Sequence, residues 1–220
     1  MAQDYVRLDK DNAAVLLVDH QAGLLSLVRD IDPDKFKNNV LAVANAAKYF
    51  NLPTILTTSF ETGPNGPLVP ELKEIHPDAP FIPRPGQINA WDNEDFVKAV
   101  KATGKKQLII AGTITSVCMA FPSISAVAEG FQVFAVIDAS GTYSKMAQEI
   151  TLARVVQAGV VPIDTAAVCS ELQKTWHRSD AADFAAAYSA IFPPYQLLIE
   201  SYQKAQDVVK NNEMLDSERT

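Results

Sequence analysis

Residues Gln107–Ile124 read Q-L-I-I-A-G-T-I-T-S-V-C-M-A-F-P-S-I, and this stretch decides the fold. The apolar run Leu108–Ala111 is typical of a buried strand, and a Gly-Thr turn follows it. Cys118 comes where the next helix should begin, near unpaired backbone N–H groups that favour a thiolate. Because α/β sheets bind ligands beyond the carboxyl ends of their strands, nucleophilic chemistry at Cys118 is the first hypothesis.

The rest of the chain repeats this pattern of a strand followed by a helix. Gly104, Gly130 and Gly159 each precede an apolar run, as expected of left-handed helix stops. Strands that alternate with helices predict right-handed crossovers and a parallel sheet. We therefore expect an α/β fold of Rossmann-like type, a three-layer α/β/α sandwich with a six-stranded parallel sheet. The strand order 3-2-1-4-5-6 is expected by analogy with other doubly wound folds. The expected strands are residues 13–19, 54–59, 81–83, 107–111, 131–137 and 160–163.

The composition narrows the class of protein. Apolar residues make up 48% of the 220, enough for a sizeable core, and the net charge of −7 disfavours broad binding to nucleic-acid phosphates. No apolar run approaches the roughly 18 residues of a membrane helix, and the first twelve residues are too polar for a signal peptide. Cys118 and Cys169 make no disulfide framework, which fits a reducing compartment. We expect a cytoplasmic protein that binds neither nucleic acid nor membranes.

The chain is interpreted as one domain over residues 1–220 with a helical extension at about 179–212. The stretch from Gly63 to Gly86 holds seven of the thirteen prolines, so it is expected to be mostly loop. The extension carries apolar residues at helical spacing, which predicts either packing on its own domain or a contact between subunits. These residues are Tyr195, Leu198, Ile199, Tyr202, Ala205 and Val209.

Two charged residues end other strands at the same edge of the predicted sheet. Asp19 closes the first strand after an apolar run, and Arg84 follows the third strand between two prolines. In the expected order the first and fourth strands are neighbours, so Asp19 and Cys118 would face each other across one crevice. Burial raises the pKa of a carboxylate and makes it a better acceptor for a thiol proton, while Arg84 would favour both charged groups.

Each of these three residues also has a simpler interpretation. Cys118 lies in an apolar run and could be an inert core residue, Asp19 could cap a turn, and Arg84 could lie on the surface. Pro122 adds a constraint, since a proline deep inside a helix costs about 3 kcal/mol. Either the helix bends there, or Cys118 sits on a turn before it.

The familiar metal and nucleotide motifs are absent from the sequence. His20, His76 and His177 form no metal-ligand pattern, and strand alternation should point His20 to the side opposite Asp19. Neither a nucleotide-binding glycine loop nor the G-x-S-x-G motif of serine hydrolases occurs. We therefore expect no metal and no cofactor.

Several longer motifs identify a family. The runs L-L-V-D-H-Q-A-G-L at 16–24 and L-I-I-A-G-T-I-T-S-V-C-M-A-F at 108–121 resemble the isochorismatase-like cysteine hydrolase superfamily. Its YcaC branch is similar at R-L-D-K (7–10), T-S-F-E-T-G-P-N-G-P-L-V-P-E-L (58–72) and R-P-G-Q-I-N-A-W-D-N-E-D-F-V-K-A-V (84–100). The resemblance covers the chain up to about residue 200 and implies a doubly wound α/β fold.

The resemblance also implies roles for single residues. Asp19 matches the general base of the family and Cys118 its nucleophile, while Arg84 lies where most members carry a lysine. A cis peptide is implied between Thr113 and Ile114, with an oxyanion hole made by the backbone N–H groups of Ile114 and Cys118. Members of this branch form large closed homo-oligomers, so a homo-oligomer, in particular an octamer, is expected.

We therefore expect a cysteine hydrolase of a small amide or related carbon–nitrogen bond. Nicotinamidases of the superfamily carry an Asp-x-His metal cluster, and members that hydrolyse isochorismate lack the cysteine, so both activities are disfavoured. A thiol redox or reactive-carbonyl scavenging protein, and an assembly with a vestigial site, are the alternatives. The candidates for the wall of the substrate pocket are Phe60, Asn89, Trp91 and Phe121, with residues 63–85 as its rim.

Overall fold

The computed structural model describes residues 5–211. Residues 1–4 of the expected domain and its last residues, including residue 212 at the end of the expected extension, lie outside this range. The chain divides into two compact units, and the boundary falls between Lys174 and Thr175. The first unit contains every strand described below, and the second contains two helices.

The first unit is built on a six-stranded sheet in which neighbouring strands run parallel. Its strands are β1 (Ala13–Val18), β2 (Thr54–Ser59), β3 (Phe81–Arg84), β4 (Gln107–Gly112), β5 (Gln132–Val136) and β6 (Val161–Ile163). The order β3-β2-β1-β4-β5-β6 confirms the predicted fold class and strand order. Because the chain starts in the middle of the sheet, the carboxyl ends of β1 and β4 lie next to each other.

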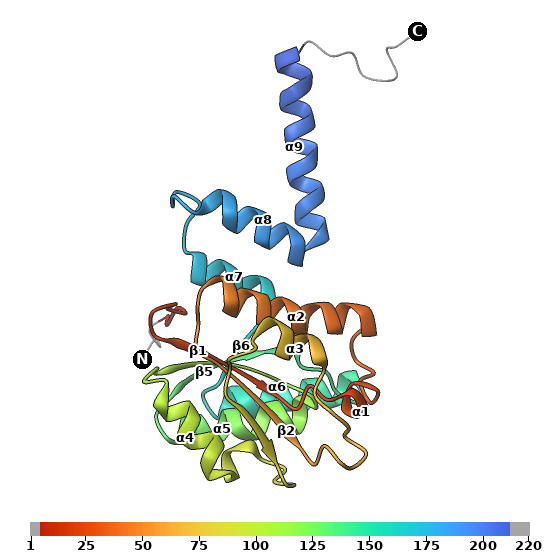
Figure 1. Cartoon of the computed structure of the whole chain (residues 1–220), viewed down its shortest axis with the longest axis vertical. Helices are drawn as coiled ribbons and strands as arrows, with labels where there is room; N and C mark the ends of the chain where they lie inside the picture. The colour runs from red at the N-terminus through yellow and green to blue at the C-terminus, as the bar shows by residue number, and fades with distance from the viewer. Residues whose placement is uncertain (1–4, 212–220) are drawn as a thin grey trace. The chain divides into compact units, whose positions relative to one another are not determined.

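Helices cover both faces of this sheet (Figure 1). They are α1 (Ala22–Leu25), α2 (Pro33–Tyr49), α3 (Pro70–Ile75), α4 (Glu94–Ala102), α5 (Ala120–Ala128), α6 (Lys145–Gln157) and α7 (Thr165–Gln173). Helices α2, α3 and α7 pack on one face, and α4, α5 and α6 on the other. Alternate residues of β1 enter opposite cores, with Val15 and Leu17 in one and Leu16 and Val18 in the other. A strand covered on both faces must be apolar throughout, which explains its continuous apolar run.

The helix ends follow ordinary capping chemistry. The carboxylate of Asp32 accepts hydrogen bonds from two N–H groups in the first turn of α2. Gly104, Gly130 and Gly159 have φ angles of 68°, 89° and 92° and follow α4, α5 and α6. The predicted left-handed helix stops are therefore confirmed.

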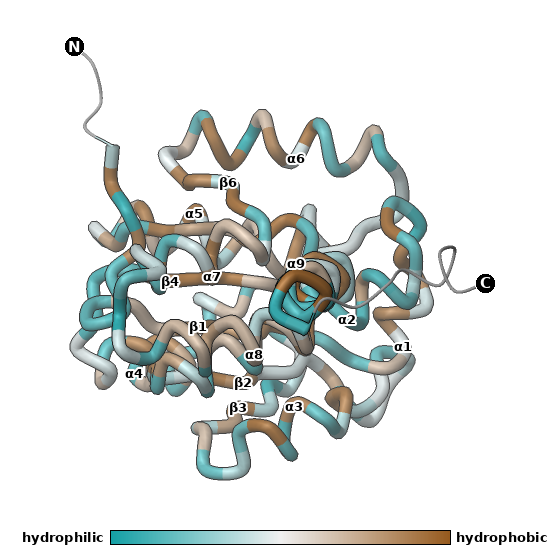
Figure 2. Tube along the Cα trace, turned by 90° about the horizontal axis from the view of Figure 1, so that it is seen from above, coloured by the Kyte–Doolittle hydropathy of each residue, from teal (hydrophilic) through white to brown (hydrophobic). Residues whose placement is uncertain are grey.

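The second unit consists of α8 (Ala181–Ile191) and α9 (Pro193–Asn211). Aromatic rings join the two helices: Tyr188 of α8 lies edge-on to Tyr195 of α9, with ring centroids 4.9 Å apart. Figure 2 looks nearly along α9, whose turns carry both apolar and polar residues. Among residues 5–211, no helix combines the length and the apolar character needed to cross a membrane.

Replacing Leu16 with alanine should destabilise the first unit strongly. Leu16 is fully buried in the central strand, so Leu16→Ala leaves a cavity and should lower the free energy of unfolding by about 2–5 kcal/mol. The control Val156→Ala removes methyl groups from a residue of α6 that is 53% exposed and should change it by less than about 0.5 kcal/mol. Urea unfolding followed by circular dichroism measures both, and equal effects would contradict the two-core architecture.

Candidate active site

Asp19 and Arg84 form a buried ion pair at the carboxyl edge of the sheet. Asp19 directly follows β1, and Arg84 is the last residue of β3, so β3 runs one residue further than expected. Nη2 of Arg84 donates to Oδ1 of Asp19, and the two residues are only 2% and 1% exposed. The interpretation of Arg84 as a surface residue is therefore excluded, and Asp19 does more than cap a turn.

The guanidinium of Arg84 is held from three sides. Nε donates to the Thr57 hydroxyl at 3.1 Å, Nη1 donates to the Gln87 carbonyl, and Nη2 reaches Asp19. The Thr57 hydroxyl in turn donates to the Ile82 carbonyl at 2.7 Å. Because each nitrogen has an acceptor, both the plane of the guanidinium and its charge have a fixed orientation.

The backbone of Asp19 has left-handed torsion angles, with φ at 58°. Its N–H still pairs with the Thr57 carbonyl at 2.9 Å, so the sheet ladder continues up to this residue. Aspartate tolerates this region better than most residues, yet the conformation persists only where the surrounding structure enforces it. Such a residue at the end of a central strand is typical of a functional site.

Cys118 lies on a wide π-type turn, η2 (Thr115–Met119), between β4 and α5. This position resolves the conflict that Pro122 raised, because the proline falls in the first turn of α5 and the cysteine precedes that helix. Gly112 ends β4, and a Cβ there would lie 2.9 Å from the carbonyl carbon of Cys118 and 2.8 Å from the nitrogen of Met119. The turn can therefore approach the strand end only over a glycine.

Burial determines which of these groups carries the proton. It raises the pKa of the Cys118 thiol well above its ordinary value of 9.0, and the charge and hydrogen bonding of Asp19 raise that pKa further. Hydrogen bonding from the Ile114 backbone and the charge of Arg84 lower it, with smaller effects. The expected favouring of a thiolate by backbone N–H groups is therefore present at Ile114 but is outweighed by burial and by Asp19, and the protonated thiol is favoured.

One oxygen of Asp19 is left for that proton. Burial raises the pKa of Asp19, while the charge and hydrogen bond of Arg84 lower it and the nearby Cys118 thiol lowers it to a smaller extent. Oδ1 is bound to Arg84, whereas Oδ2 is buried and has no formed hydrogen bond to any residue within 5–211. Since the Cys118 thiol interacts with the Asp19 carboxyl and Oδ1 is occupied by Arg84, Oδ2 is the acceptor that remains for the thiol proton.

The two predicted oxyanion donors differ in availability. The Thr113–Ile114 peptide bond is cis, and the Ile114 backbone hydrogen-bonds to the Cys118 sulfur. The N–H of Cys118, in contrast, already donates to the Ile114 carbonyl at 2.8 Å, which also accepts from Val117 at 3.0 Å. Cys118 can therefore serve as an oxyanion donor only if its N–H is shared between two acceptors.

Two neighbours of Asp19 hold the site together and were not predicted to belong to it. The Gln21 side chain accepts from the Ser59 N–H at 2.8 Å and donates to the Ser59 carbonyl at 3.0 Å, which ties the turn after β1 to the end of β2. His20 is fully buried, and its Nδ1 lies 2.8 Å from the Thr113 hydroxyl. Burial lowers the pKa of His20 to about 3, so its ring is neutral. The polar run D-H-Q directly after an apolar strand was the signal for both residues.

Two of the four predicted pocket-wall residues are the phenylalanines Phe60 and Phe121, which differ in exposure. Phe60 follows β2 at the carboxyl edge, is 49% exposed, and donates its N–H to the Arg84 carbonyl at 3.0 Å. Phe121 is half-buried on α5, where the Arg154 guanidinium of α6 lies 5.3 Å from its ring centroid. Phe60 therefore lies beside the ion pair, whereas Phe121 is engaged by the neighbouring helix.

The other two residues belong to the short turn η1 (Ala90–Asp92): Asn89 directly precedes it, and Trp91 lies within it. Trp91 is buried, and its indole N–H donates to Glu129 at 2.8 Å. The side chain of Asn89 accepts from the Trp91 N–H at 3.1 Å and donates to the Ser125 hydroxyl at 3.1 Å. These contacts give both residues a structural role in tying the turn to α5.

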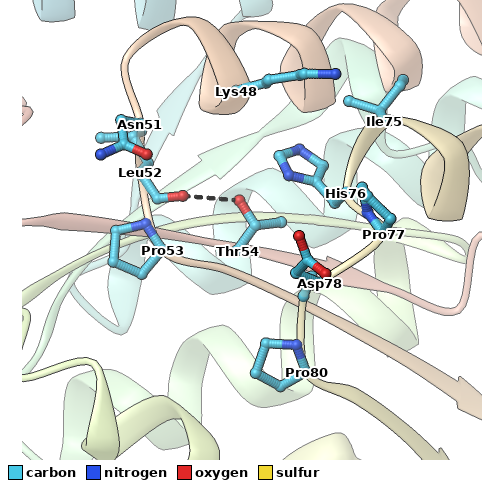
Figure 3. Close-up of a pocket in the computed structure, with 11 residues that line it drawn as sticks. Lys48, Asn51, Leu52, Pro53, Thr54, Ile75, His76, Pro77, Asp78 and Pro80 are labelled. Carbon is cyan, nitrogen blue, oxygen red and sulfur yellow. Dashed lines mark hydrogen bonds between the residues drawn. The ribbon is translucent and has the colours of Figure 1, made fainter.

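The surface pockets of the structure described here are not lined by Cys118. One of about 480 Å³ lies at the amino ends of β2 and β3, where the Thr54 hydroxyl donates to the Leu52 carbonyl at 3.1 Å (Figure 3). That is the edge opposite the one where parallel sheets bind ligands. Cys118 itself is 8% exposed, so the approach to its sulfur is narrow. Among the residues that the structure describes, no three His, Cys, Asp or Glu side chains are placed to hold a metal ion.

Comparison with known proteins gives close relatives. The isochorismatase domain family matches residues 13–167. The probable hydrolase YcaC of Escherichia coli strain K12 is 65% identical over 202 residues, which cover 92% of this chain and 97% of that protein. The structure of YcaC from Pseudomonas aeruginosa with hexane-2,5-diol and covalent acrylamide is 62% identical, with a TM-score of 0.90 over 92% of this chain and 100% of that chain. The E. coli YcaC crystal structure, described as an octameric hydrolase of unknown specificity, is 64% identical, with a TM-score of 0.90 over 93% and 100%.

Removing the charge of Asp19 should make Cys118 more reactive toward alkylation. Asp19 raises the pKa of the thiol, so Asp19→Asn should lower that pKa and increase the thiolate fraction at neutral pH. Since thiolate nucleophilicity falls with pKa, iodoacetamide labelling should rise about threefold for each unit by which the pKa falls.

Peptide mass spectrometry at pH 7 measures this labelling, with Asp92→Asn as a matched exposed control and circular dichroism to verify folding. Slower or unchanged labelling of Cys118 in folded Asp19→Asn protein would contradict the assigned interaction.

Proposed function

Because this chain belongs to the isochorismatase family of hydrolases, we propose that it is a cysteine hydrolase of a small amide or related carbon–nitrogen bond. Cys118 is the nucleophile, Asp19 the general base and acid, and Arg84 the residue that holds Asp19. The observation that carries this proposal is the divided carboxylate of Asp19, with one oxygen on Arg84 and the other unfilled beside a protonated thiol. The reaction needs no metal or cofactor, since each proton moves between these side chains, substrate and water.

The first half of the reaction forms an acyl-enzyme. Oδ2 of Asp19 takes the thiol proton as the Cys118 sulfur attacks the carbonyl carbon, and the carbonyl oxygen becomes an oxyanion. The Ile114 N–H, already adjacent to the sulfur, is the first donor to that oxyanion, and the Cys118 N–H joins by sharing its proton. As the intermediate collapses, the carbon–nitrogen bond breaks and the Asp19 proton passes to the leaving nitrogen.

The second half releases the acid and restores the enzyme. Asp19, again ionised, accepts a proton from a water molecule as the oxygen of that water attacks the thioester carbon. The carbon–sulfur bond then breaks, and the departing sulfur recovers the proton from Asp19. A raised pKa of Asp19 suits both halves, because the carboxyl must hold a proton between one transfer and the next.

Arg84 contributes charge and position and exchanges no proton. The three guanidinium nitrogens of Arg84 donate hydrogen bonds to Thr57, Gln87 and Asp19, so Arg84 keeps the carboxylate in one orientation. Its charge also lowers the pKa of both Asp19 and Cys118, which limits the cost of separating charge as the thiol proton moves. In this chain the basic residue is therefore an electrostatic partner of the reaction.

The relatives support both the chemistry and the assembly. The P. aeruginosa YcaC structure holds a covalent acrylamide, a small primary amide whose alkene reacts with thiols. We infer that the site of this chain admits small amides of similar size, in line with the narrow approach to Cys118. The E. coli YcaC structure is octameric, and we infer that this chain too forms a homo-oligomer.

A panel of small amides and imides tests the function. Wild type should release ammonia or amine from at least one member, and Cys118→Ala should lower kcat/KM for it by at least about 10³-fold, because the nucleophile is lost. Cys169→Ala is the matched control, since Cys169 is buried on α7, which packs on the face of the sheet opposite the core that contains Cys118.

An amide hydrolysed equally by wild type and Cys118→Ala would contradict the mechanism. A thiol that peroxide oxidises reversibly, in protein that turns over no amide, would favour a redox role. Activity at the Cys118→Ala level across the whole panel would favour a vestigial site.

A further inference from the structure

The backbone donor beside the Cys118 sulfur belongs to a short segment that other elements hold from two sides. This segment, residues 112–115, joins the end of β4 to the start of η2 and contains the Ile114 N–H. On the side of β1, the Thr113 N–H donates to the Val18 carbonyl at 3.1 Å. The Thr113 hydroxyl lies 2.8 Å from Nδ1 of His20. The residues after the central strand therefore hold one side of the segment.

Loop 140–142 lies beyond the end of β5 and holds the other side. The pairing of β4 with β5 stops before Gly112, so the Gly112 N–H donates to a side chain instead, the Ser140 hydroxyl, at 3.0 Å. The same hydroxyl donates to the Val136 carbonyl at 2.7 Å, and the Ser140 carbonyl accepts from the Thr115 hydroxyl at 2.5 Å. Ser140 is fully buried and binds residues at both ends of the segment.

Loop 140–142 is itself fixed in place. Gly141 accepts from the Thr115 N–H at 2.9 Å, which adds a third hydrogen bond between the loop and the segment. The Thr142 N–H donates to the Asp30 side chain at 2.7 Å. Asp30 is only 5% exposed, so water competes little for this hydrogen bond. The loop is therefore a firm support for the turn that carries the nucleophile.

We propose that Ser140 is a positioning residue, which sets the place of the Ile114 N–H that receives the oxyanion. This inference rests on the proposed function. Ser140 acts without touching substrate, because its hydrogen bonds to Gly112 and Thr115 lie one on each side of Ile114. An oxyanion donor is effective only within hydrogen-bond distance of the developing charge, so a small displacement of the segment removes part of its effect.

Kinetics on an amide that wild type hydrolyses test this role in the reaction. Ser140→Ala removes the acceptor of the Gly112 N–H, and Thr115→Val removes one hydroxyl from the same contact while keeping the side-chain shape. Each should lower kcat about 10- to 100-fold and leave KM within about twofold, because the oxyanion forms only after attack. Thr115→Ser, which keeps the hydroxyl, should retain most of the wild-type kcat. Thr54→Val is the matched control, since Thr54 is a buried threonine at the opposite edge of the sheet.

The pH profile of Cys118 alkylation tests the same contact without any amide. The Ile114 backbone lowers the pKa of the thiol, so a displaced Ile114 N–H should raise that pKa and move the midpoint of iodoacetamide labelling to higher pH. Asp19 and Arg84, the charged groups that also act on the thiol, are unchanged in every variant. Peptide mass spectrometry measures the labelling, and circular dichroism verifies that each variant is folded.

We expect the shift in Ser140→Ala and Thr115→Val, and the wild-type midpoint in Thr115→Ser and Thr54→Val. If Ser140→Ala does not fold, Thr115→Val decides the test, since both substitutions act on one contact. A midpoint at or below that of wild type would overturn the proposal, and so would an equal shift in Thr54→Val. A raised KM with unchanged kcat would also overturn it. If wild type hydrolyses no amide, the proposed function fails, while a shifted midpoint still supports the contact between Ser140 and the donor segment.

Discussion

The buried ion pair between Asp19 and Arg84 is the interaction on which the rest of the site depends. Removing two charges from water is expensive, and their attraction offsets that cost only when hydrogen bonds satisfy the remaining groups. Arg84 meets this condition through Thr57 and Gln87, whereas Asp19 leaves one oxygen unfilled. In the proposed reaction this oxygen is the one that accepts the thiol proton.

The same burial raises the pKa of the Cys118 thiol. A cysteine in an electropositive, partly exposed place would rest as a thiolate, but here desolvation and the carboxylate keep the proton on sulfur. In the proposed reaction the nucleophile therefore forms only as the thiol proton leaves, and the resting protein exposes little reactive thiolate. The close approach of the η2 turn over Gly112, with the Ile114 backbone against the sulfur, fixes where that attack takes place.

Much of this architecture could be predicted from the sequence, because backbone and burial rules act locally. The unbroken apolar run of β1 required cover on both faces, and the helix stops at Gly104 and Gly130 required left-handed torsion angles. Once the strand order was expected, Asp19 and Cys118 had to share an edge. The protonation of Cys118 could not be predicted, because desolvation depends on atoms from distant segments. The same holds for Trp91, whose partner Glu129 lies 38 residues away, and for the Cys118 N–H, whose partner depends on the π-type turn.

The central claim is that the proton of the resting site sits on the Cys118 sulfur, beside the Asp19 carboxyl that Arg84 holds. The most direct test is an ultraviolet titration of thiolate absorbance in Cys169→Ala protein, where Cys118 is the thiol that remains. The account predicts no thiolate absorbance through neutral pH and a rise only above the ordinary cysteine value of 9.0. A thiolate already formed at pH 7 in the folded protein would contradict it.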